Sequence, residues 1–316
     1  MVELINFANY DTNRDMIENS SAGLKSLLTE LGVDGIEALF CDPWDAAVLP
    51  ASSIHGVHLN FWPTWLDFWR GNQQALERQF GSRENILAYF GGTEPEQMLA
   101  CYRRDISQAK AAAAKYIVFH VSHNELDEIY TWRFRADSLA VVDATIEMVN
   151  SIVDDIPPDM TILFENLWWP GLTLLEPRLV DRLLSRIRHP KVGIMLDTGH
   201  LMNTNPELQD ERQGVEYVLS VLGKLGTLSN SIQGIHLHQS LSGAYVKQSR
   251  CQTAPPVDLA ASMAHIMQID QHRPFSDSAA KQILELVQPE YLVHEFIVAS
   301  REELVVNTNL QRKALR

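Results

Sequence analysis

The chain has few cysteines and no recognisable export signal. Its 316 residues include only Cys41, Cys101 and Cys251, an odd number with no CxxC pair. This pattern argues against a disulfide framework and a cysteine-bound metal, and it favours free thiols in a reducing compartment. The first residues, MVELINFANYD, carry acids early and lack a basic stretch before an apolar one, so we expect no secretory signal. We therefore expect a cytoplasmic protein.

Long apolar runs and excess positive charge are also missing. No uninterrupted apolar run approaches the roughly 18 residues that a membrane span needs, so we expect no membrane partner. Lys and Arg number 26 against 40 Asp and Glu, which gives a formal net charge of −14. Such a surface repels phosphate backbones at long range. The composition therefore disfavours nucleic acid as a partner and favours a small-molecule substrate.

Linkers and low-complexity segments are absent as well, and the chain instead alternates between two kinds of segment. Short apolar runs rich in β-branched and aromatic residues predict strands at 2–7, 35–40, 54–59, 116–120, 161–165, 192–197, 232–237 and 291–296. Amphipathic segments predict helices at 20–31, 94–114, 135–155, 177–187, 211–225 and 301–315. Residues 240–254 are expected to form a loop, followed by helical material to about residue 287.

Eight strands interleaved with helices predict an α/β protein, a single (β/α)8 TIM barrel covering residues 1–316. The length suits one barrel of roughly 250 residues with insertions, although two average domains would also fit. We expect an aromatic-rich insertion at about 60–93 and a long loop at about 240–275. The alternative is an open doubly wound sheet, but no Gly-rich phosphate loop follows the first strand.

Six of the apolar runs end in a residue that can bind a metal ion. They are GVHLN with His58, YIVFH with His120, TILFE with Glu165, VGIMLD with Asp197, IQGIHLH with His236 and YLVHE with Glu295. A parallel barrel would bring these strand ends to one rim, where such enzymes keep their chemistry. His, Asp and Glu side chains together suit a hard or borderline divalent cation. We predict at least one metal ion, bound through Glu165, Asp197, His236 and Glu295.

Other candidate ligands lie outside these strand ends. His200 follows Asp197 in LDTGH, after a turn containing Gly199, so both side chains could reach one ion or two adjacent ions. Asp270 and His272 lie in QIDQHRPF, where an extended backbone would point both side chains the same way. A plain helix-terminus pair would also explain them. For His58 and His120, a role as satisfied core histidines is the alternative to metal binding.

Several residues near these ligands are predicted to contact the substrate. His238 lies two residues after His236 and points to the same side of its strand. The neighbouring tryptophans could wall a pocket for a sugar or an extended organic molecule, or could pack a helix against the barrel or form a subunit interface. The predicted substrate-contacting residues are His238, His123, Trp168, Trp169 and Trp62.

The order of these motifs resembles a known family. Glu in ENLWWPG, Asp and His in LDTGH, His in IHLHQ and Glu in VHEF are arranged as in the xylose isomerase-like TIM barrels, or AP endonuclease family 2. Resemblance to the sugar epimerases of this family implies one ion, often Mn or Co, and two glutamates that act as acid and base beside a carbonyl. These glutamates would be Glu165 and Glu295.

Resemblance to endonuclease IV implies a larger centre with three zinc ions. Its ligands would be His58, His120, Glu165, Asp197, His200, His236, Asp270, His272 and Glu295.

Two departures weigh against each close relative. The epimerases have an Arg shortly after the counterpart of His236 and a second Glu after that of Glu165, whereas SLSGAY and WWPG stand here. The DNA-reading loops of endonuclease IV are missing, and the aromatic insertion offers only Arg70 for a phosphate. Stacking of bases on aromatic side chains normally accompanies a positive groove.

These observations leave three functional hypotheses. The first is a metal-dependent enzyme that moves a proton next to a carbonyl of a small polar or sugar-like substrate, with Glu165 and Glu295 as catalytic residues. The alternative is an endonuclease IV-like hydrolase that uses two or three ions to cleave a phosphoester. The third is a non-catalytic binding member of the fold. The metal is left open among Mn, Co, Mg, Zn and Fe, and so is assembly into a homo-oligomer.

Overall fold

The computed structural model describes residues 1–255 and 258–316 and contains one closed sheet of parallel strands. The strands pair in sequence order, and the last closes on the first, which confirms the predicted TIM barrel. Their bounds are β1 (Val2–Ala8), β2 (Gly35–Leu39), β3 (Ile54–His58), β4 (Tyr116–His120), β5 (Thr161–Glu165), β6 (Val192–Asp197), β7 (Ile232–Leu237) and β8 (Tyr291–His294). Because every strand runs the same way, all of their carboxyl ends open on one rim.

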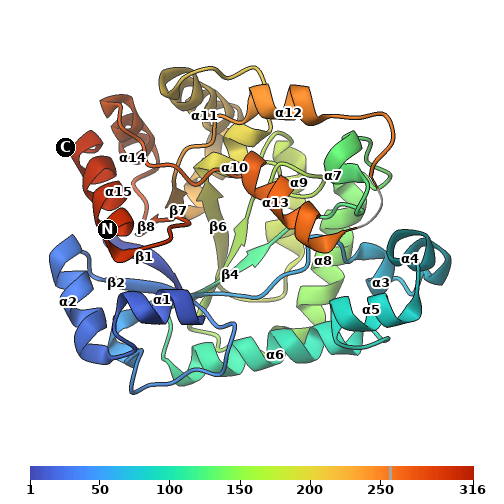
Figure 1. Ribbon diagram of the computed structural model, residues 1–316, viewed down its shortest axis with the longest axis horizontal. Helices are drawn as coiled ribbons and strands as arrows, with labels where there is room; N and C mark the ends of the chain where they lie inside the picture. The colour runs from blue at the N-terminus through green and yellow to red at the C-terminus, as the bar shows by residue number, and fades with distance from the viewer. Residues whose placement is uncertain (256–257) are drawn as a thin grey trace.

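Helices surround the barrel, and the two chain termini lie near each other at one side of it (Figure 1). Those on the first half are α1 (Asp11–Met16), α2 (Ser21–Leu31), α3 (Leu66–Trp69), α4 (Gln73–Phe80), α5 (Arg83–Phe90), α6 (Glu96–Ala111), α7 (Glu128–Thr131) and α8 (Ser138–Ile152). Those on the second half are α9 (Pro177–Arg186), α10 (Thr198–Asn203), α11 (Glu211–Leu225), α12 (Gly243–Ser249), α13 (Leu259–Ile269), α14 (Lys281–Val287) and α15 (Arg301–Ala314). Within the described ranges, no helix is long and apolar enough to cross a membrane.

Local sequence signals account for where the longer helices begin and end. The Ser20 hydroxyl accepts the backbone N–H of Gly23 at the start of α2, and Gly32 ends this helix in the left-handed conformation. Asp137 and Asp210 cap α8 and α11 in the same way. These caps fix where each of the helices begins.

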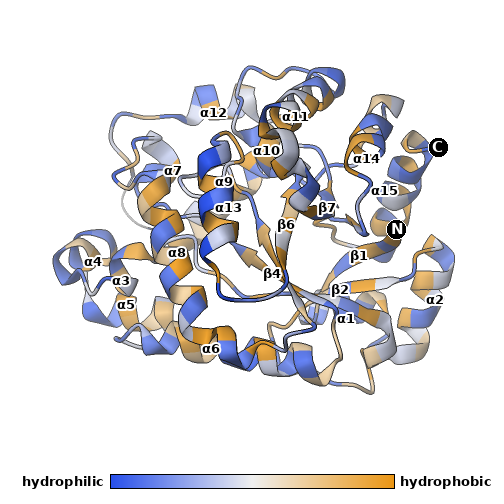
Figure 2. Cartoon of the chain, turned by 180° about the vertical axis from the view of Figure 1, so that it is seen from behind, coloured by the Kyte–Doolittle hydropathy of each residue, from blue (hydrophilic) through white to orange (hydrophobic). Residues whose placement is uncertain are grey.

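The core has two layers. Leu4, Tyr116, Leu163, Met195 and Val293 fill the inside of the barrel, and a larger apolar layer lies between the strands and the surrounding helices. Figure 2 shows helices such as α6 and α8 with alternating hydrophobic and hydrophilic bands, as expected for helices with one buried face. The packed interior excludes a pore and leaves the rim as the place for chemistry.

We expect Gly56→Ala to destabilise the protein by about 3 kcal/mol, because core overpacking typically costs 1–3 kcal/mol. Gly56 lies in β3, and an added Cβ would overlap the ring of Tyr116 inside the barrel. The measurement is the free energy of unfolding in urea. The control is Gly223→Ala in α11, where an added Cβ meets no atom within 4 Å and helix propensity favours Ala by about 1 kcal/mol. Equal stability of the two variants would contradict the packing argument.

Two segments differ from the sequence-based expectation. The expected loop at 240–254 contains the helix α12. This helix has seven residues, too few for a helical hydrophobic period to be recognised in the sequence. The long loop expected at about 240–275 is wrong in this respect, because it also contains α13, in line with the helical material expected after residue 254. Residues 256–257, within that range, lie outside the described residues. The insertion expected at about 60–93 forms three short helices, α3, α4 and α5.

Candidate metal centre

The carboxyl ends of the strands surround a cavity of about 330 Å³. Charged and imidazole side chains form one end of it, including Glu37, His58, His120, His200 and Glu295. Most of the remaining lining is apolar. Behind this surface, Glu165, Asp197 and His236 have no exposed area.

All nine predicted ligands meet in this region, together with His238. Their potential ligand atoms form four groups, in each of which the atoms lie within 4.8 Å of one another. The groups are His58–His120–Glu165, Glu165–Asp197–His236, Asp197–His238–Glu295 and His200–His238–Asp270–His272. Because the first three groups are linked through Glu165 and Asp197, and the fourth shares His238 with the third, the site is one connected cluster.

Glu165, at the end of β5, lies at the junction of the cluster. Its Oε2 is 3.2 Å from Nε2 of both His58 and His120 and 3.3 Å from Nδ1 of His236. Its Oε1 is 3.0 Å from Nδ1 of His200. Glu165 therefore contacts imidazoles from β3, β4 and β7 through one oxygen and the His200 ring through the other.

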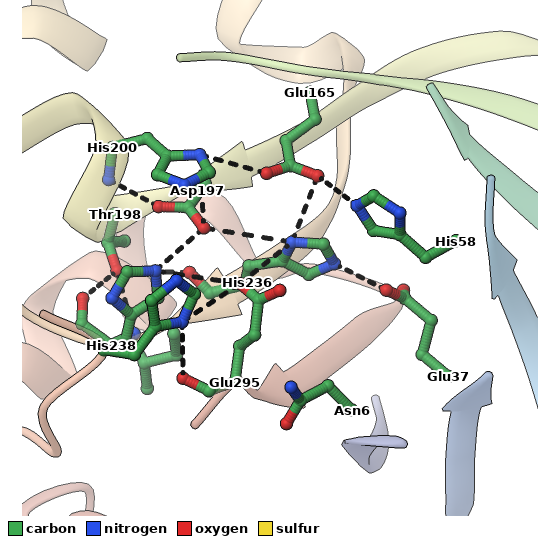
Figure 3. A network of polar contacts seen from close by, with 12 residues as sticks. Asn6, Glu37, His58, Glu165, Asp197, Thr198, His200, His236, His238 and Glu295 are labelled. Atoms are coloured by element: carbon green, nitrogen blue, oxygen red, sulfur yellow. Dashed lines mark hydrogen bonds and ion pairs between the residues drawn. The ribbon is translucent and has the colours of Figure 1, made fainter. Parts of the chain in front are cut away.

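His236, at the centre of Figure 3, is surrounded by carboxylates. Its Nδ1 is 3.3 Å from Oε2 of both Glu165 and Glu295 and 3.9 Å from Oδ2 of Asp197. None of these contacts has hydrogen-bond geometry, so His236 Nδ1 and Glu295 Oε2 are buried without a hydrogen-bond partner. Such unpaired buried atoms are costly unless a ligand satisfies them.

The group that contains His200, His238, Asp270 and His272 is centred on the Asp270 carboxylate. Asp270 Oδ2 is 3.2 Å from Nε2 of His200 and 2.8 Å from Nε2 of His272. The His238 ring stacks on His272 at 4.0 Å between centroids, while its Nε2–H donates to Asp197 Oδ2 at 2.9 Å.

In His58 and His200, the ring nitrogen Nδ1 is held by a backbone carbonyl, as is typical of histidines that bind a metal through Nε2. Nδ1–H of His58 donates to the carbonyl of Leu59 at 2.9 Å, and Nδ1–H of His200 donates to that of Asn166 at 3.0 Å. In a neutral ring this leaves Nε2 as a bare lone pair directed into the cluster. Metal-binding histidines are held in this way by hydrogen bonds to carbonyls and carboxylates.

Two further histidines follow the same rule. His272 Nδ1 lies 3.3 Å from the backbone carbonyl of Glu295, and His236 Nε2 lies 2.9 Å from Glu37 Oε1. Bare lone pairs would then face carboxylates, an arrangement that a cation between them stabilises. The donor set therefore fits divalent cations.

The neighbouring carboxylates also raise the pKa values of His236 and His272. Burial alone would lower the pKa of His236, but Glu295, Glu37 and Glu165 raise it well above its ordinary value. Burial likewise opposes the effect of Asp270 on His272, whose pKa is raised to about 9. Protons and cations thus compete for these nitrogens. Within the described part of the chain, no Lys or Arg forms an ion pair with the four cluster carboxylates.

The backbone places two of the ligands in unexpected ways. Asp197 is the N-cap of α10, where its Oδ1 accepts the N–H of His200 at 2.6 Å, so the predicted turn is a helix start. His272 has a φ of 45°, and the expected extended backbone between Asp270 and His272 is therefore wrong. With His272 in this left-handed conformation, its Nε2 still lies 2.8 Å from Asp270 Oδ2.

The sequence analysis did not identify Glu37 and Asn166, which hold the candidate ligands His236 and Asp197 in place. Glu37, in β2, is 2% exposed and also accepts the hydroxyl of Tyr116 at 2.8 Å. Asn166 binds both the backbone N–H and carbonyl of Asp197 at 2.9 Å. A lone Glu within the apolar run GIEALF was the signal for Glu37, because a buried carboxylate needs a partner.

The predicted substrate-contacting residues occupy different places. Trp168 and Trp169 line the cavity. Trp62 donates its indole N–H to the carbonyl of Tyr89 at 3.2 Å, and His238 is fully buried within the cluster. His123 is 2% exposed, and its Nδ1 accepts the backbone N–H of Trp65 at 3.2 Å. The last three residues do not belong to the cavity lining.

His123 should make stability depend on pH. Burial, with a smaller effect from Arg70, lowers the pKa of His123 from 6.5 to about 3. The unfolded chain therefore binds a proton below pH 6.5 that the folded chain does not, and stability falls as the pH drops from 6.5 toward 3, by about 1.4 kcal/mol per pH unit.

The measurement is urea unfolding at pH 7.5 and pH 5. Comparison with His123→Asn isolates this residue from other titrating groups, and the wild type should lose about 2 kcal/mol more than the variant. Equal losses would show that the ring is not held neutral.

Solved structures share the fold over nearly the whole length. Endonuclease IV from Thermus thermophilus is 14% identical, with a TM-score of 0.57 and coverage of 100% of this chain and 99% of that one. A D-tagatose 3-epimerase-like protein is 14% identical, with a TM-score of 0.55 and coverage of 100% and 97%. A putative xylose isomerase from Rhodospirillum rubrum ATCC 11170 is 14% identical, with a TM-score of 0.56 and coverage of 100% and 98%. At these identities the likeness shows the fold alone.

No curated protein matches the sequence. The family model described as "Xylose isomerase-like TIM barrel" matches residues 26–286, most of the chain and most of the cluster. The chain therefore belongs to the xylose isomerase-like TIM barrel family, as its motifs predicted.

Proposed function

We propose that this protein is a hydrolase that uses two or three divalent cations to cleave a phosphoester. The observation that carries the proposal is the extent of the cluster. Beyond Glu165, Asp197, His236 and Glu295, five further residues lie in the connected groups: His58, His120, His200, Asp270 and His272. A single ion does not require them, whereas several adjacent ions do.

Three sets of residues would hold the cations. One consists of His58, His120 and Glu165, one of Glu165, Asp197, His236 and Glu295, and one of His200, Asp270 and His272. When bound, such cations lower the pKa of a coordinated water toward neutrality and polarise a phosphoryl oxygen. The sharing of Glu165 between two of the sets supports neighbouring ions over a single ion.

The chain itself supplies proton transfer and water exclusion. Among the four cluster carboxylates, the side chain of Glu295 is the most exposed, at 13%, and it reaches the cavity. Its Oε2 faces the cluster, so its other carboxylate oxygen is the one that can accept the proton of an attacking water. Leu167, Trp168 and Trp169 form an apolar wall beside the cluster, which lowers the local dielectric and strengthens its charge interactions.

Epimerisation of a sugar is the second candidate. Glu165 and Glu295 approach His236 Nδ1 from two directions, each at 3.3 Å. Two carboxylates around one ion could remove and return a proton on opposite sides of a carbon. The named relatives include both a D-tagatose 3-epimerase-like protein and an endonuclease IV, so the extra ligands must decide between the two chemistries.

His58→Ala and His272→Ala separate the candidates. Each removes a ligand of the larger cluster and leaves the four epimerase-type ligands in place. As a hydrolase, the zinc- or manganese-loaded protein should cleave 4-nitrophenyl phosphate or bis(4-nitrophenyl) phosphate. Each variant should lose at least about 100-fold in kcat/KM, because mutating a residue that only orients a metal ligand already costs about 10- to 100-fold. Deuterium exchange into D-tagatose that survives both substitutions, without ester cleavage, would instead establish the epimerase.

We also predict that Glu37→Gln weakens metal binding about 10- to 100-fold without removing a ligand. Glu37 fixes His236 by accepting its Nε2–H at 2.9 Å, and the amide is a weaker acceptor. Competition with a chromophoric chelator measures this affinity. Asn150→Asp, at a helix surface outside the cluster, is the control and should bind metal as the wild type does. Unchanged affinity in Glu37→Gln would deny Glu37 its positioning role.

A further inference from the structure

We infer that the ester cleaved at this site carries an uncharged apolar group of ring size or larger, rather than a sugar or a polynucleotide. This inference rests on the proposed hydrolase function and concerns the cavity outside the cluster. In the reaction, water oxygen bonds to phosphorus and the ester P–O bond breaks. Glu295 accepts the proton that water releases and returns it to solvent, and the departing oxygen takes a proton from solvent, so the products are an apolar alcohol and a phosphate.

The cavity wall is built from apolar side chains on separate segments. Leu167 and Trp169 come from the loop after β5, Phe61 from the loop after β3, and Ile266 and Met267 from α13. These segments lie between the cluster and solvent, so a substrate whose ester reaches the cluster must bury its other end among them. Burial of apolar surface there contributes about 25 cal/mol per Å².

The apolar lining continues to the surface. Tyr10 and Phe61 are each 41% exposed, Ile297 is 51% exposed and Met263 is 53% exposed, although all four line the cavity. Large apolar side chains left in water at the entrance of a site indicate a ligand or partner that covers them. Here the cavity beneath them indicates a small molecule.

Polar partners for a sugar are scarce in the same wall. The Asn6 amide already donates one hydrogen bond to the Phe296 carbonyl at 3.1 Å and accepts the Phe296 N–H at 3.0 Å, which fixes its orientation. Outside the cluster, the remaining polar groups of the described lining are the side chains of Tyr10 and Asn13 and the indole N–H groups of Trp168 and Trp169, which are buried without a partner. The described lining contains no Lys or Arg. The several hydroxyls of a sugar and the phosphates of a polynucleotide would therefore lose more hydrogen bonds to water than this wall returns, and the phosphates would gain no Lys or Arg countercharge from it.

The test compares ligands that differ only in this group. Calorimetric titration of the zinc-loaded protein should show phenylphosphonate binding at least about tenfold more tightly than methylphosphonate, as expected for added apolar contact in a pocket. Turnover of 1-naphthyl phosphate should likewise exceed that of glucose 6-phosphate and of an abasic-site oligonucleotide.

Two rim variants and one control complete the test, with Met263 and the control residue on α13 and Ile297 in the segment after β8. Met263→Ser and Ile297→Ser should each reduce the preference for phenylphosphonate at least about threefold, because each removes apolar contact. Leu259→Ser is the matched control, since Leu259 begins α13 and is 45% exposed but does not line the cavity. It should leave the preference unchanged.

The outcomes separate this inference from the proposed function. Equal binding of the two phosphonates, binding of neither, or faster cleavage of the sugar phosphate or oligonucleotide would overturn the apolar substrate. Preferential binding of phenylphosphonate with no cleavage of any phosphoester would support the apolar site and overturn the hydrolase.

Discussion

Glu165→Gln is expected to lower kcat by at least about 10³-fold while the fold stays intact, comparable to removing a key electrostatic group from other catalytic sites. Glu165 contacts His58, His120 and His236 through one oxygen and His200 through the other. An amide cannot replace both anionic oxygens at this junction, so the variant should also bind fewer ions. Steady-state kinetics, metal content and far-UV circular dichroism measure the three effects.

Glu128→Gln is the matched control for this substitution. The Glu128 carboxylate is also buried, at 1% exposure, but it accepts backbone N–H groups of Glu125 and Arg135 outside the cluster. This variant should keep its metal and its kcat while losing some stability, because a buried hydrogen bond to a charge is weakened. Retained turnover in Glu165→Gln would remove Glu165 from the catalytic role.

Chelation of the metal is expected to lower the melting temperature by roughly 10 °C. A ligand at about 1,000 times its Kd stabilises the folded state by about 4 kcal/mol per site, and a fall of this size follows for two or more sites in a large domain. The physical reason is the loss of countercharge among buried carboxylates that no Lys or Arg of the described chain pairs with. Differential scanning calorimetry with and without dipicolinate provides the measurement.

Asp197→Asn supplies the comparison for chelation. Asp197 has no exposed area and takes part in two ligand groups, so its amide variant should bind less metal and show a smaller shift on chelation. Zinc added back to the wild type should restore the original melting temperature. An identical melting temperature in chelated and metal-loaded wild type would mean that the folded state does not depend on the ions.

The barrel could be predicted because its strands are short and strongly apolar. The bounds of β4, β5, β6 and β7 coincide with the predicted runs, since each is flanked by polar or turn-forming residues. Short helices could not be predicted in this way. α10 and α12, with six and seven residues, are too short for a 3.6-residue period to appear, and their formation depends on tertiary contacts such as the Asp197 cap.

The site could be predicted to the extent that its ligands end strands. His58, His120, Glu165, Asp197 and His236 lie at strand ends, and parallel topology alone brings them together. The junction of Asp270 and His272 depends on a left-handed φ at His272, which no local pattern indicates.

The partner of His236, Glu37, lies 199 positions away in the chain, so only the closed barrel reveals the pair. The apolar character of the cavity likewise emerges from side chains on separate loops and α13. The predicted partners, subcellular location and oligomeric state stay predictions.

Metal stoichiometry per chain, measured by elemental analysis after reconstitution and removal of free metal, tests the multinuclear cluster most directly. Two or three zinc, manganese or iron ions per chain are predicted, falling by at least one in His58→Ala and in His272→Ala. A content of one ion that neither substitution changes, or no bound ion at all, would contradict the account.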